Sequence, residues 1–309
     1  MKKHGGMIMK VAIAGGSGFV GKAITKELHA ENHDVYILTR NIAGKENSER
    51  LAYVQWLNEG DHPEKALEGV DAMINLAGVS LNSGRWTNER KKQIVESRLN
   101  ATNELNRIAA KLDTKPQVLL NASAVGYYGT SNTGAFTEAD VKLPSDFLSE
   151  TVHQWEQAAS KIELQGVRTV YMRFGVILGK DEGALPSMLL PYKLFVGGTV
   201  GKGDQWLSWI HIEDVAKAAL FCIANPSLQG PVNFTAPEPR TMKEFGKTIA
   251  SIMHKPHWMP APAPLMKLAL GDMSILVLEG QKVLPAKLIE HGYPFSYPTL
   301  EEALQNLLV

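Results

Sequence analysis

The sequence contains a single cysteine, no excess of either charge and no long apolar run. One cysteine, Cys222, excludes an internal disulfide and any zinc site built from cysteines, and it fits a reducing compartment. We expect Cys222 to be a small buried hydrophobe. Lysine plus arginine and aspartate plus glutamate both number 32, so net charge does not attract the chain to nucleic acid or to an anionic membrane.

Apolar stretches stay well short of the ~20 residues that a membrane helix needs. The opening segment, residues 1–10, is too short and too interrupted by glycine to be a secretory signal. We therefore expect a cytoplasmic protein, a monomer or homodimer, whose partner is a small-molecule substrate and not nucleic acid or a membrane. Because Met7 and Met9 look like alternative starts, residues 1–9 are expected to form a disordered extension.

What the sequence does contain is an alternation of strand-like and helix-like segments from residue 10 to about residue 178. Several strand-like segments are nearly continuous apolar runs, as parallel strands buried on both faces require. This alternation predicts βαβ units and an α/β fold with a Rossmann-type, doubly wound parallel sheet. The expected strands are 10–14, 34–39, 52–56, 72–77, 117–122 and 168–174, and the expected helices are 21–30, 87–111 and 147–164.

Beyond residue 179 the alternation ends, and glycine-rich loops, a helix at 213–224 and a proline-rich stretch at 256–264 follow. These features predict a smaller, loop-rich C-terminal lobe. We assign residues 10–180 to a dinucleotide-binding Rossmann domain and residues 181–309 to a smaller lobe that holds substrate or acts as a lid.

Three glycines, Gly15, Gly18 and Gly21, stand between the first expected strand and the first expected helix. In a dinucleotide-binding turn the first glycine permits the tight bend, the second lets the backbone approach the pyrophosphate, and the third lets the helix pack on the strand. The helix N-terminus then offers unpaired N–H groups and a partial positive charge to the phosphates. The alternative is a glycine-rich turn without a ligand, and the strand–turn–helix context favours the dinucleotide site.

The end of the second expected strand indicates which dinucleotide binds. NAD enzymes usually have an acid there for the ribose hydroxyls, whereas an arginine accommodates the 2′-phosphate of NADP. This chain has Thr39 and Arg40, with no acid before Glu46. A guanidinium can hold the 2′-phosphate with two hydrogen bonds, and a carboxylate would repel it. The alternative is that Arg40 is only a solvated charge; we predict NADP(H).

Further segments resemble the extended short-chain dehydrogenase/reductases, and among them the atypical group called epimerase family proteins. The resemblance runs from residue 10 to the end of the chain. It implies an NAD-dependent epimerase/dehydratase-like domain and a small C-terminal domain, at about residues 255–305, that closes over the nicotinamide. The segments are GGSGFVG (15–21), Asp71, NLAG (75–78), RWT (85–87), ESR (96–98), SAVGYYG (123–129), WE (155–156), WIHI (209–212), GQKVLP (280–285) and YPTL (297–300).

The resemblance also implies which residues bind the cofactor. The turn after the first strand would hold the pyrophosphate, and the end of the second strand would hold the 2′-phosphate. The end of the fourth strand would line the adenosine side, with Arg98 reaching a phosphate or ribose. These residues are Gly15, Ser17, Gly18, Phe19 and Val20, then Thr39 and Arg40, then Leu76, Ala77 and Gly78, with Ser123, Gly175, Val176 and Ile177 near the nicotinamide.

The usual catalytic pair of that superfamily is absent. Its members use a tyrosine in Y-x-x-x-K as acid/base, with the lysine lowering its pKa. The helix expected to carry this pair, 147–164, has no tyrosine, and its only lysine, Lys161, lies four residues after Gln157. The serine is ambiguous as well, because alignment on Tyr128 places Ala124 at the serine position and alignment one residue earlier places Ser123 there.

Ser123, Tyr128 and Glu156 remain as weak catalytic candidates. Ser123 and Tyr128 could polarise a carbonyl, or they could only pack and orient the cofactor. Glu156 could act as an acid or base if apolar surroundings raised its pKa, although a glutamate on a helix is usually solvated or paired.

Histidines and tryptophans of the C-terminal half have two interpretations each. His211 could act on substrate, or it could hydrogen-bond at the junction of a strand and a helix. His254 and His257 lack the spacing and the carboxylate of a metal site, so we expect no metal. Trp206 and Trp209 could form a lid over substrate or belong to the core of the smaller lobe.

Three functions follow from these features. The first is an NADPH-dependent oxidoreductase that acts on an unidentified small carbonyl or sugar-like compound with a non-standard proton donor. The second is a catalytically silent protein that binds NADP(H) and acts as a sensor or interaction partner, which the missing tyrosine and lysine favour. The third, nucleotide-sugar epimerisation, needs an acid/base on each side of the sugar, and the absent pair argues against it.

Overall fold

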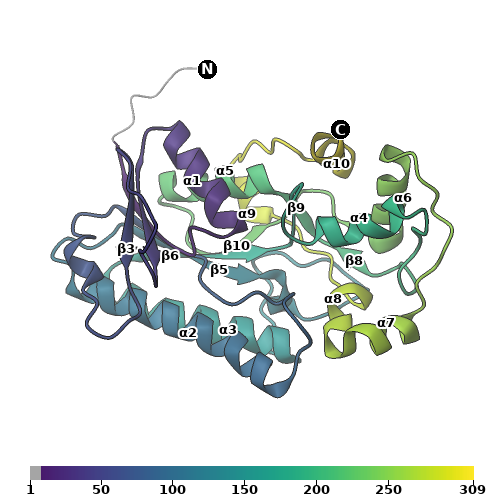
Figure 1. Ribbon diagram of the computed structural model, residues 1–309, viewed down its shortest axis with the longest axis horizontal. Coiled ribbons are helices and arrows are strands. Elements are labelled where there is room, and N and C mark those ends of the chain that lie inside the picture. The colour runs from purple at the N-terminus through teal and green to yellow at the C-terminus, as the bar shows by residue number, and fades with distance from the viewer. Residues whose placement is uncertain (1–7) are drawn as a thin grey trace.

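The computed structural model describes residues 8–309, and Figure 1 shows their arrangement. Seven parallel strands form one sheet in the order β10-β6-β5-β4-β1-β2-β3. This is the strand order of a Rossmann fold with one further strand at the end. The strands are β1 (Lys10–Ala14), β2 (Asp34–Thr39), β3 (Leu51–Gln55), β4 (Ala72–Asn75), β5 (Val118–Ala124), β6 (Arg168–Phe174) and β10 (Gly230–Phe234).

Helices cover both faces of the sheet because side chains alternate along each strand. In β1, Val11 and Ile13 enter a core shared with α1 (Phe19–Ala30) and α5 (Ile212–Ala224). The intervening alanines of β1 enter the opposite core, shared with α2 (Asn88–Lys111) and α3 (Phe147–Ser160). In Figure 1, α2 and α3 lie below the sheet and α1 and α5 above it. The predicted α/β, doubly wound fold is confirmed.

Two predicted elements end two or more residues earlier than expected. The strand expected at 72–77 stops at Asn75, whose side chain bonds to groups beneath the sheet. The helix expected at 147–164 stops at Ser160 and continues as the 3-10 helix η3 (Lys161–Gln165), which Gly166 terminates in a left-handed conformation (φ 79°).

The sequence analysis missed β10, which pairs with β6 and extends the sheet beyond residue 180. Its sequence, GPVNF, has too few consecutive apolar residues to stand out. A proline is tolerated there because β10 is an edge strand. The sheet and its covering helix α5 therefore include residues that we had assigned to the smaller lobe.

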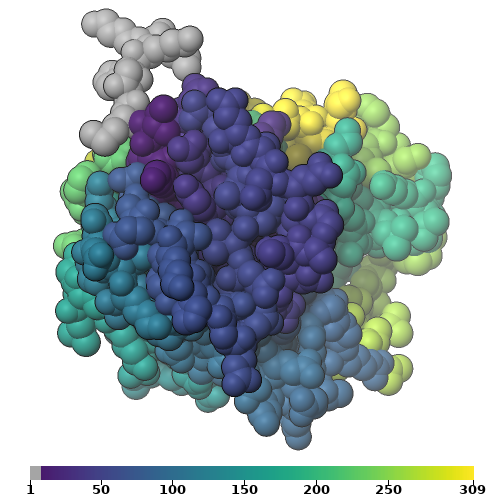
Figure 2. Space-filling model, turned by 60° about the vertical axis from the view of Figure 1, so that its left-hand side comes forward, coloured from purple at the N-terminus to yellow at the C-terminus, as the bar shows by residue number. Residues whose placement is uncertain are grey.

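No helix lies between β2 and β3, which the loop of residues 40–50 connects. Parallel neighbours are usually joined by a helix that covers the sheet. Its absence leaves a hollow of about 480 Å³ between α1 and the β3 edge. Figure 2 turns this edge toward the viewer, with the N-terminal part of the chain at its centre. The hollow is lined by Gly16, Ser17, Lys22, Thr25, Lys26, His29, Ile37, Leu51 and Tyr53.

A third core holds the C-terminal part together. It is enclosed by α4 (Leu185–Lys193), α6 (Met242–Ile252) and α10 (Leu300–Leu308). Trp209 is fully buried in it, so the core interpretation is correct for this residue. Trp206 is half-buried, and the Lys282 ammonium lies 4.6 Å from its ring centroid. Short strand pairs connect this core to the sheet: β7 (Val176–Leu178) with β9 (Trp209–His211), and β8 (Trp206–Leu207) with β11 (Arg240–Thr241).

Two helices of this part pack differently. None of the side chains of α7 (Ala263–Leu270) or α8 (Ile275–Leu278) is buried, although both helices are rich in leucine. The 3-10 helix η4 (Gly271–Ser274) joins them. We call residues 263–278 the α7–α8 module. By contrast, α9 (Ala286–Glu290) inserts Leu288 into the core between the main sheet, α1 and α5.

Two further predictions concern the N-terminal segment and the single cysteine. The extension expected at residues 1–9 lies outside the described residues up to residue 7, while Met9 donates its N–H to His33 Nδ1 (3.1 Å) and is part of the fold. Cys222 is fully buried as expected, and burial raises the pKa of its thiol to about 12. Within residues 8–309, no helix has the length and apolar character needed to cross a membrane.

Candidate functional site

The glycine turn lies where the carboxyl end of β1 meets the N-terminus of α1. Gly15 has φ +80°, and a Cβ there would come within 2.8 Å of the Leu76 carbonyl group. A Cβ on Gly21 would lie 2.4 Å from the Gly15 oxygen, so α1 can pack on the turn only without a side chain. Gly18 is the N-cap of α1, makes no side-chain capping bond, and is followed by no acidic residue in the first turn. The turn therefore presents backbone N–H groups suited to an anion.

Phe19 and Val20 hold this turn from the inside. The Phe19 ring fits against Gly179 and Gly183, where a Cβ would come within 2.4 and 2.9 Å of it. Val20 packs on the core between the sheet, α1 and α5, and Ser17 is exposed. Phe19 and Val20 thus place their backbone at the turn with side chains that face the protein.

At the end of β2, Arg40 is exposed and only its carbonyl is engaged, accepting from Asn58 Nδ2 (3.0 Å). Thr39 donates its hydroxyl to the Asn41 carbonyl (3.0 Å). Within residues 8–309 no carboxylate lies at ion-pair distance from Arg40. Since parallel strands end at one edge of the sheet, Arg40 lies on the same edge as the glycine turn.

The chain leaving β4 is fixed by a buried amide. Asn75 donates to Thr102 Oγ1 (2.9 Å) and to Asn121 Oδ1 (2.7 Å), and its own Oδ1 accepts the Ala77 N–H (3.2 Å). Thr102 lies on α2 and Asn121 on β5. This network sets the path of Leu76, Ala77 and Gly78 beside the glycine turn.

Arg98 of α2 reaches the same place. A Cβ on Gly78 would come within 3.2 Å of its guanidinium, so the glycine makes room for it. The guanidinium donates to the Val79 and Ile94 carbonyls (3.2 and 2.9 Å) and lies 5.0 Å from the Trp155 ring centroid. Burial lowers the pKa of Arg98 to about 10, which leaves it cationic at neutral pH. Among the described residues it has no carboxylate partner, and a poorly solvated cation of this kind favours an anionic ligand.

The three weak catalytic candidates belong to one buried network, which Arg173 joins. The Arg173 guanidinium donates to both Glu156 oxygens (2.8 and 2.9 Å) and to the Tyr128 hydroxyl (3.0 Å). Ser123 donates its hydroxyl to Glu156 (2.6 Å), and Tyr128 donates to Asn233 Oδ1 (2.8 Å). All five side chains are buried. Sequence analysis missed Arg173 and Asn233, although a charged residue at the end of an apolar strand was a signal for a buried ion pair.

The hydrogen bonds of this network engage the hydroxyl protons that an acid catalyst would have to donate. Glu156 is paired, as the alternative interpretation held, and the only hydroxyl proton of Ser123 points to it. Burial raises the pKa of Tyr128 to about 12, so its proton is not readily lost. The network therefore fixes the ends of β5, β6 and β10 relative to α3.

Gly175, Val176 and Ile177 lie where the chain leaves β6. A Cβ on Gly175 would come within 2.5 Å of the Ser208 carbonyl oxygen, which also accepts the Val176 N–H (2.8 Å). Val176 packs on the C-terminal core and Ile177 on the sheet core. The segment thus joins the two parts of the molecule next to the network.

The histidines have structural roles. His211 caps α5 by accepting the Glu213 N–H at Nδ1 (3.1 Å), and its ring lies 3.9 Å from the Tyr297 ring between centroids, tilted by 31°. His257 hydrogen-bonds with Tyr192 (3.0 Å), and His254 is exposed. Within the part of the chain that the structure describes, no group of three side chains is placed to hold a metal ion.

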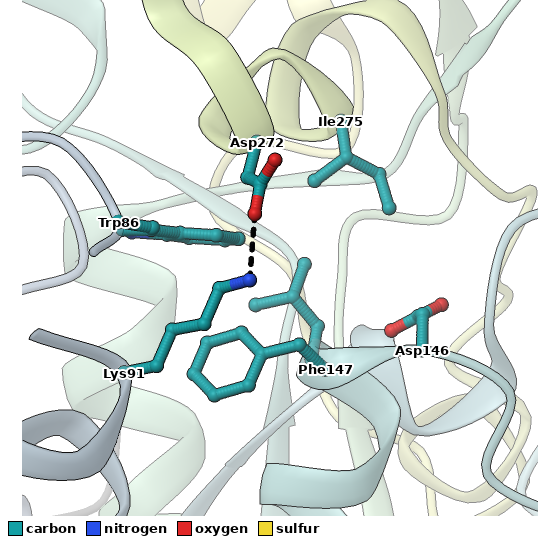
Figure 3. A pocket seen from close by; sticks show the side chains of 7 residues that line it. Trp86, Lys91, Asp146, Phe147, Asp272 and Ile275 are labelled. Carbon is teal, nitrogen blue, oxygen red and sulfur yellow. Dashed lines mark hydrogen bonds and ion pairs between the residues drawn. The ribbon is translucent and has the colours of Figure 1, made fainter. Parts of the chain in front are cut away.

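A cavity of about 200 Å³ lies between the N-terminal part of α2, the first turn of α3 and the α7–α8 module (Figure 3). Phe147 and Leu148, in the first turn of α3, form part of its wall, and α3 is the helix that was expected to carry the superfamily tyrosine. Leu148 is also the nearest neighbour of Gly126, just beyond the end of β5, which places the cavity at the carboxyl edge of the sheet. The lining residues are Trp86, Lys91, Asp146, Phe147, Leu148, Asp272 and Ile275.

Comparison with known proteins agrees with this architecture. Residues 11–234 match the family described as "NAD dependent epimerase/dehydratase family", and residues 261–307 match a "Domain of unknown function (DUF1731)". The epimerase family protein YfhF of Bacillus subtilis (strain 168) is 50% identical over 300 residues, which cover 97% of this chain and 98% of that protein. An epimerase family protein of Staphylococcus aureus (strain N315) is 44% identical over 297 residues, which cover 96% of this chain and 98% of that protein.

A solved structure is similar over the same length. The crystal structure of the human epimerase family protein SDR39U1 (isoform 2) with NADPH has 31% sequence identity and a TM-score of 0.85, and the match covers 97% of this chain and 99% of that one. The glycine turn, the Rossmann strand order and these matches together show that the chain belongs to the NAD-dependent epimerase/dehydratase family, in the group of epimerase family proteins with this C-terminal domain.

Proposed function

We propose that this protein is an NADP(H)-binding oxidoreductase that acts on a small carbonyl or sugar-like substrate. The main observation in support of this proposal is that Arg40 and Arg98, at one edge of the sheet, both lack a carboxylate partner among residues 8–309. NADP(H) differs from NAD(H) by one phosphate, which such guanidinium groups bind with charge-assisted hydrogen bonds. The human relative solved with NADPH is consistent with this choice.

Each part of the edge has a task in this proposal. The glycine turn and the N-terminus of α1 bind the diphosphate, and Arg40 binds the 2′-phosphate. Leu76, Ala77 and Gly78 line the adenosine side, with Arg98 on a phosphate or ribose. When bound, the nicotinamide supplies or accepts a hydride at its C4 atom. Ser123 and Gly175–Ile177 are positioning residues near the nicotinamide, because their polar groups are already bonded within the protein.

Calorimetric titration with NADPH and NADH tests the cofactor. NADPH should bind at least about tenfold more tightly, since charge-assisted hydrogen bonds are worth about 1.5–3 kcal/mol. Arg40→Ala should remove most of that preference and leave NADH binding within about twofold, whereas Lys65→Ala, at an exposed position, should change neither. Equal affinity for both dinucleotides, or a preference that survives Arg40→Ala, contradicts the proposal.

Turnover is tested separately by stopped-flow absorbance of the nicotinamide with aldehydes, ketones and sugars. A catalytically silent NADP(H)-binding sensor is the second candidate, and one observation favours it: the Ser123 and Tyr128 hydroxyls are both committed to the buried network. That candidate predicts tight NADPH binding, no turnover, and a protein partner retained in only one redox state. Nucleotide-sugar epimerisation has less support, because it needs an acid/base on each side of the sugar and α3 carries neither the tyrosine nor the lysine of the usual pair.

A further inference from the structure

Among the described residues that line the cavity, Lys91 supplies the only cationic group, its ammonium. It lies on α2, 5.3 Å from the Phe147 ring centroid, and its side chain is 27% exposed. Its ion-pair partner is Asp272 Oδ2 at 2.6 Å, on an aspartate whose side chain is 65% exposed. Figure 3 shows the pair between Trp86 and Phe147. A half-buried cation is thus paired with a carboxylate that loses little when it returns to water.

The segment that carries Asp272 has few buried side chains. No side chain of α7 or α8 is fully buried, although Ser274 of η4 is buried and Gln205 Nε2 donates to the Val277 carbonyl (2.8 Å) in α8. Arg85 holds the end of α7 through the Leu268 and Ala269 carbonyls (3.2 and 3.0 Å), and Lys91 holds η4 through Asp272. Both attachments on the cavity side are polar contacts to two basic side chains. A competing anion can therefore displace Asp272 without disrupting a hydrophobic core.

The other residues that line the cavity indicate which further groups a ligand would have. Trp86 and Phe147 meet edge to face with ring centroids 5.3 Å apart, and Leu148 and Ile275 add aliphatic surface. Asp146 lies on the far side of Phe147 from Lys91 in Figure 3. One of its oxygens accepts the Ser149 N–H (2.9 Å) at the start of α3, where the helix dipole favours a carboxylate. Asp146 can accept a hydrogen bond from a ligand hydroxyl and would repel a second anionic group.

We infer that this cavity binds a small organic carboxylate with an apolar body, whose charged group takes the place of Asp272 at the Lys91 ammonium. The inference names a substrate class for the site of the proposed function and rests on that function only for what happens after binding. It also assigns the α7–α8 module a role, because exchange of Asp272 for the ligand frees the module from α2.

Non-reacting pairs of probes test this directly. Benzoate, phenylacetate and cyclohexanecarboxylate are titrated into the full chain by calorimetry, each against its uncharged amide, with and without NADP⁺. Carboxylates should bind at least about tenfold more tightly than amides, and Lys91→Met should reduce this ratio below about twofold. Lys92→Met is the matched control, because Lys92 is exposed on the same helix and forms a long surface ion pair with Glu96 (3.8 Å).

Asp272→Asn gives a result that a purely structural ion pair would not give. Removal of the competing carboxylate should tighten binding of the three carboxylates about two- to fivefold and leave the amides unchanged. Weaker or unaltered carboxylate binding in Asp272→Asn overturns the inference. So does equal binding, or no binding, of acids and amides in the unaltered protein.

Two controls distinguish loss of the carboxylate site from misfolding and from loss of cofactor binding. Thermal melts confirm that each variant is folded, and Lys91→Gln is the second variant should Lys91→Met unfold. NADP⁺ is titrated into the same preparations. Cofactor binding without a carboxylate preference refutes the inference and leaves the proposed function standing, whereas a carboxylate preference without cofactor binding does the reverse.

Discussion

Arg173 and Arg98 are both largely shielded from water, but they differ in whether a carboxylate among the described residues neutralises them. Arg173 has a two-point ion pair with Glu156, whereas Arg98 has only carbonyl groups and an aromatic ring. A buried charge with an ionic partner completes a structural network, and a cation without one favours an anion from outside. This contrast separates the network at the end of β6 from the cofactor edge.

The network predicts a large loss of stability on removal of Glu156. Glu156→Ala leaves Arg173 buried without a counter-charge, which should lower the free energy of unfolding by about 3 kcal/mol. Glu150→Ala, at an exposed position on the same helix, should cost less than about 1 kcal/mol. Urea denaturation followed by circular dichroism measures both. The double variant Glu156→Leu, Arg173→Met should recover part of the loss; a Glu156→Ala cost equal to that of Glu150→Ala would show that the ion pair is not energetically important.

Elements of this molecule differ in how far the sequence predicted them. The strands of the sheet and the glycine turn are set by short stretches of chain, so their patterns were visible. β10 was missed because its GPVNF sequence depends on pairing with β6. The cavity could not be predicted, because its wall joins Trp86 and Lys91 to Asp272 and Ile275, which only the fold brings together. The partners of Ser123 and Tyr128 were hidden for the same reason.

The N-terminus of α5 gives a prediction about pH. Burial is the main cause that lowers the pKa of His211 below its ordinary value of 6.5. The unfolded chain therefore binds a proton there more readily, so this group lowers stability as pH falls through 6.5 and until the folded-state pKa is reached. His211→Asn keeps a good N-cap and should lose less stability than the unaltered protein between pH 7 and pH 5. Urea midpoints across that range measure the difference, and the exposed His254→Asn should behave like the unaltered protein. Parallel pH profiles for His211→Asn and the unaltered protein would contradict the prediction.

At the scale of the whole molecule, the C-terminal part is not packed as a separate unit. Segment 280–284 bonds to the loop of 131–136 through the Gly280 and Lys282 carbonyls, and Asn233 of the buried network donates to the Leu284 carbonyl (2.9 Å). α9 then places Leu288 in the core shared by the sheet, α1 and α5. The family-specific region and the Rossmann sheet therefore share one hydrophobic core.

A shared core predicts one unfolding transition. Leu288 is fully buried and its neighbour Ile289 is 54% exposed, so the two form a matched pair on one helix. Leu288→Ala should lower the free energy of unfolding by about 2–5 kcal/mol, and Ile289→Ala by less than about 0.5 kcal/mol. Circular dichroism reports on the whole chain, and tryptophan fluorescence reports on both parts, because Trp56 is buried in the core between the sheet and α2 and Trp209 in the C-terminal core. Both signals should move to the same lower denaturant midpoint in Leu288→Ala. Two separate fluorescence transitions, of which Leu288→Ala shifts only one, would mean that the two parts unfold independently, and the contacts of α9 with the sheet would then contribute little to the stability of the Rossmann domain.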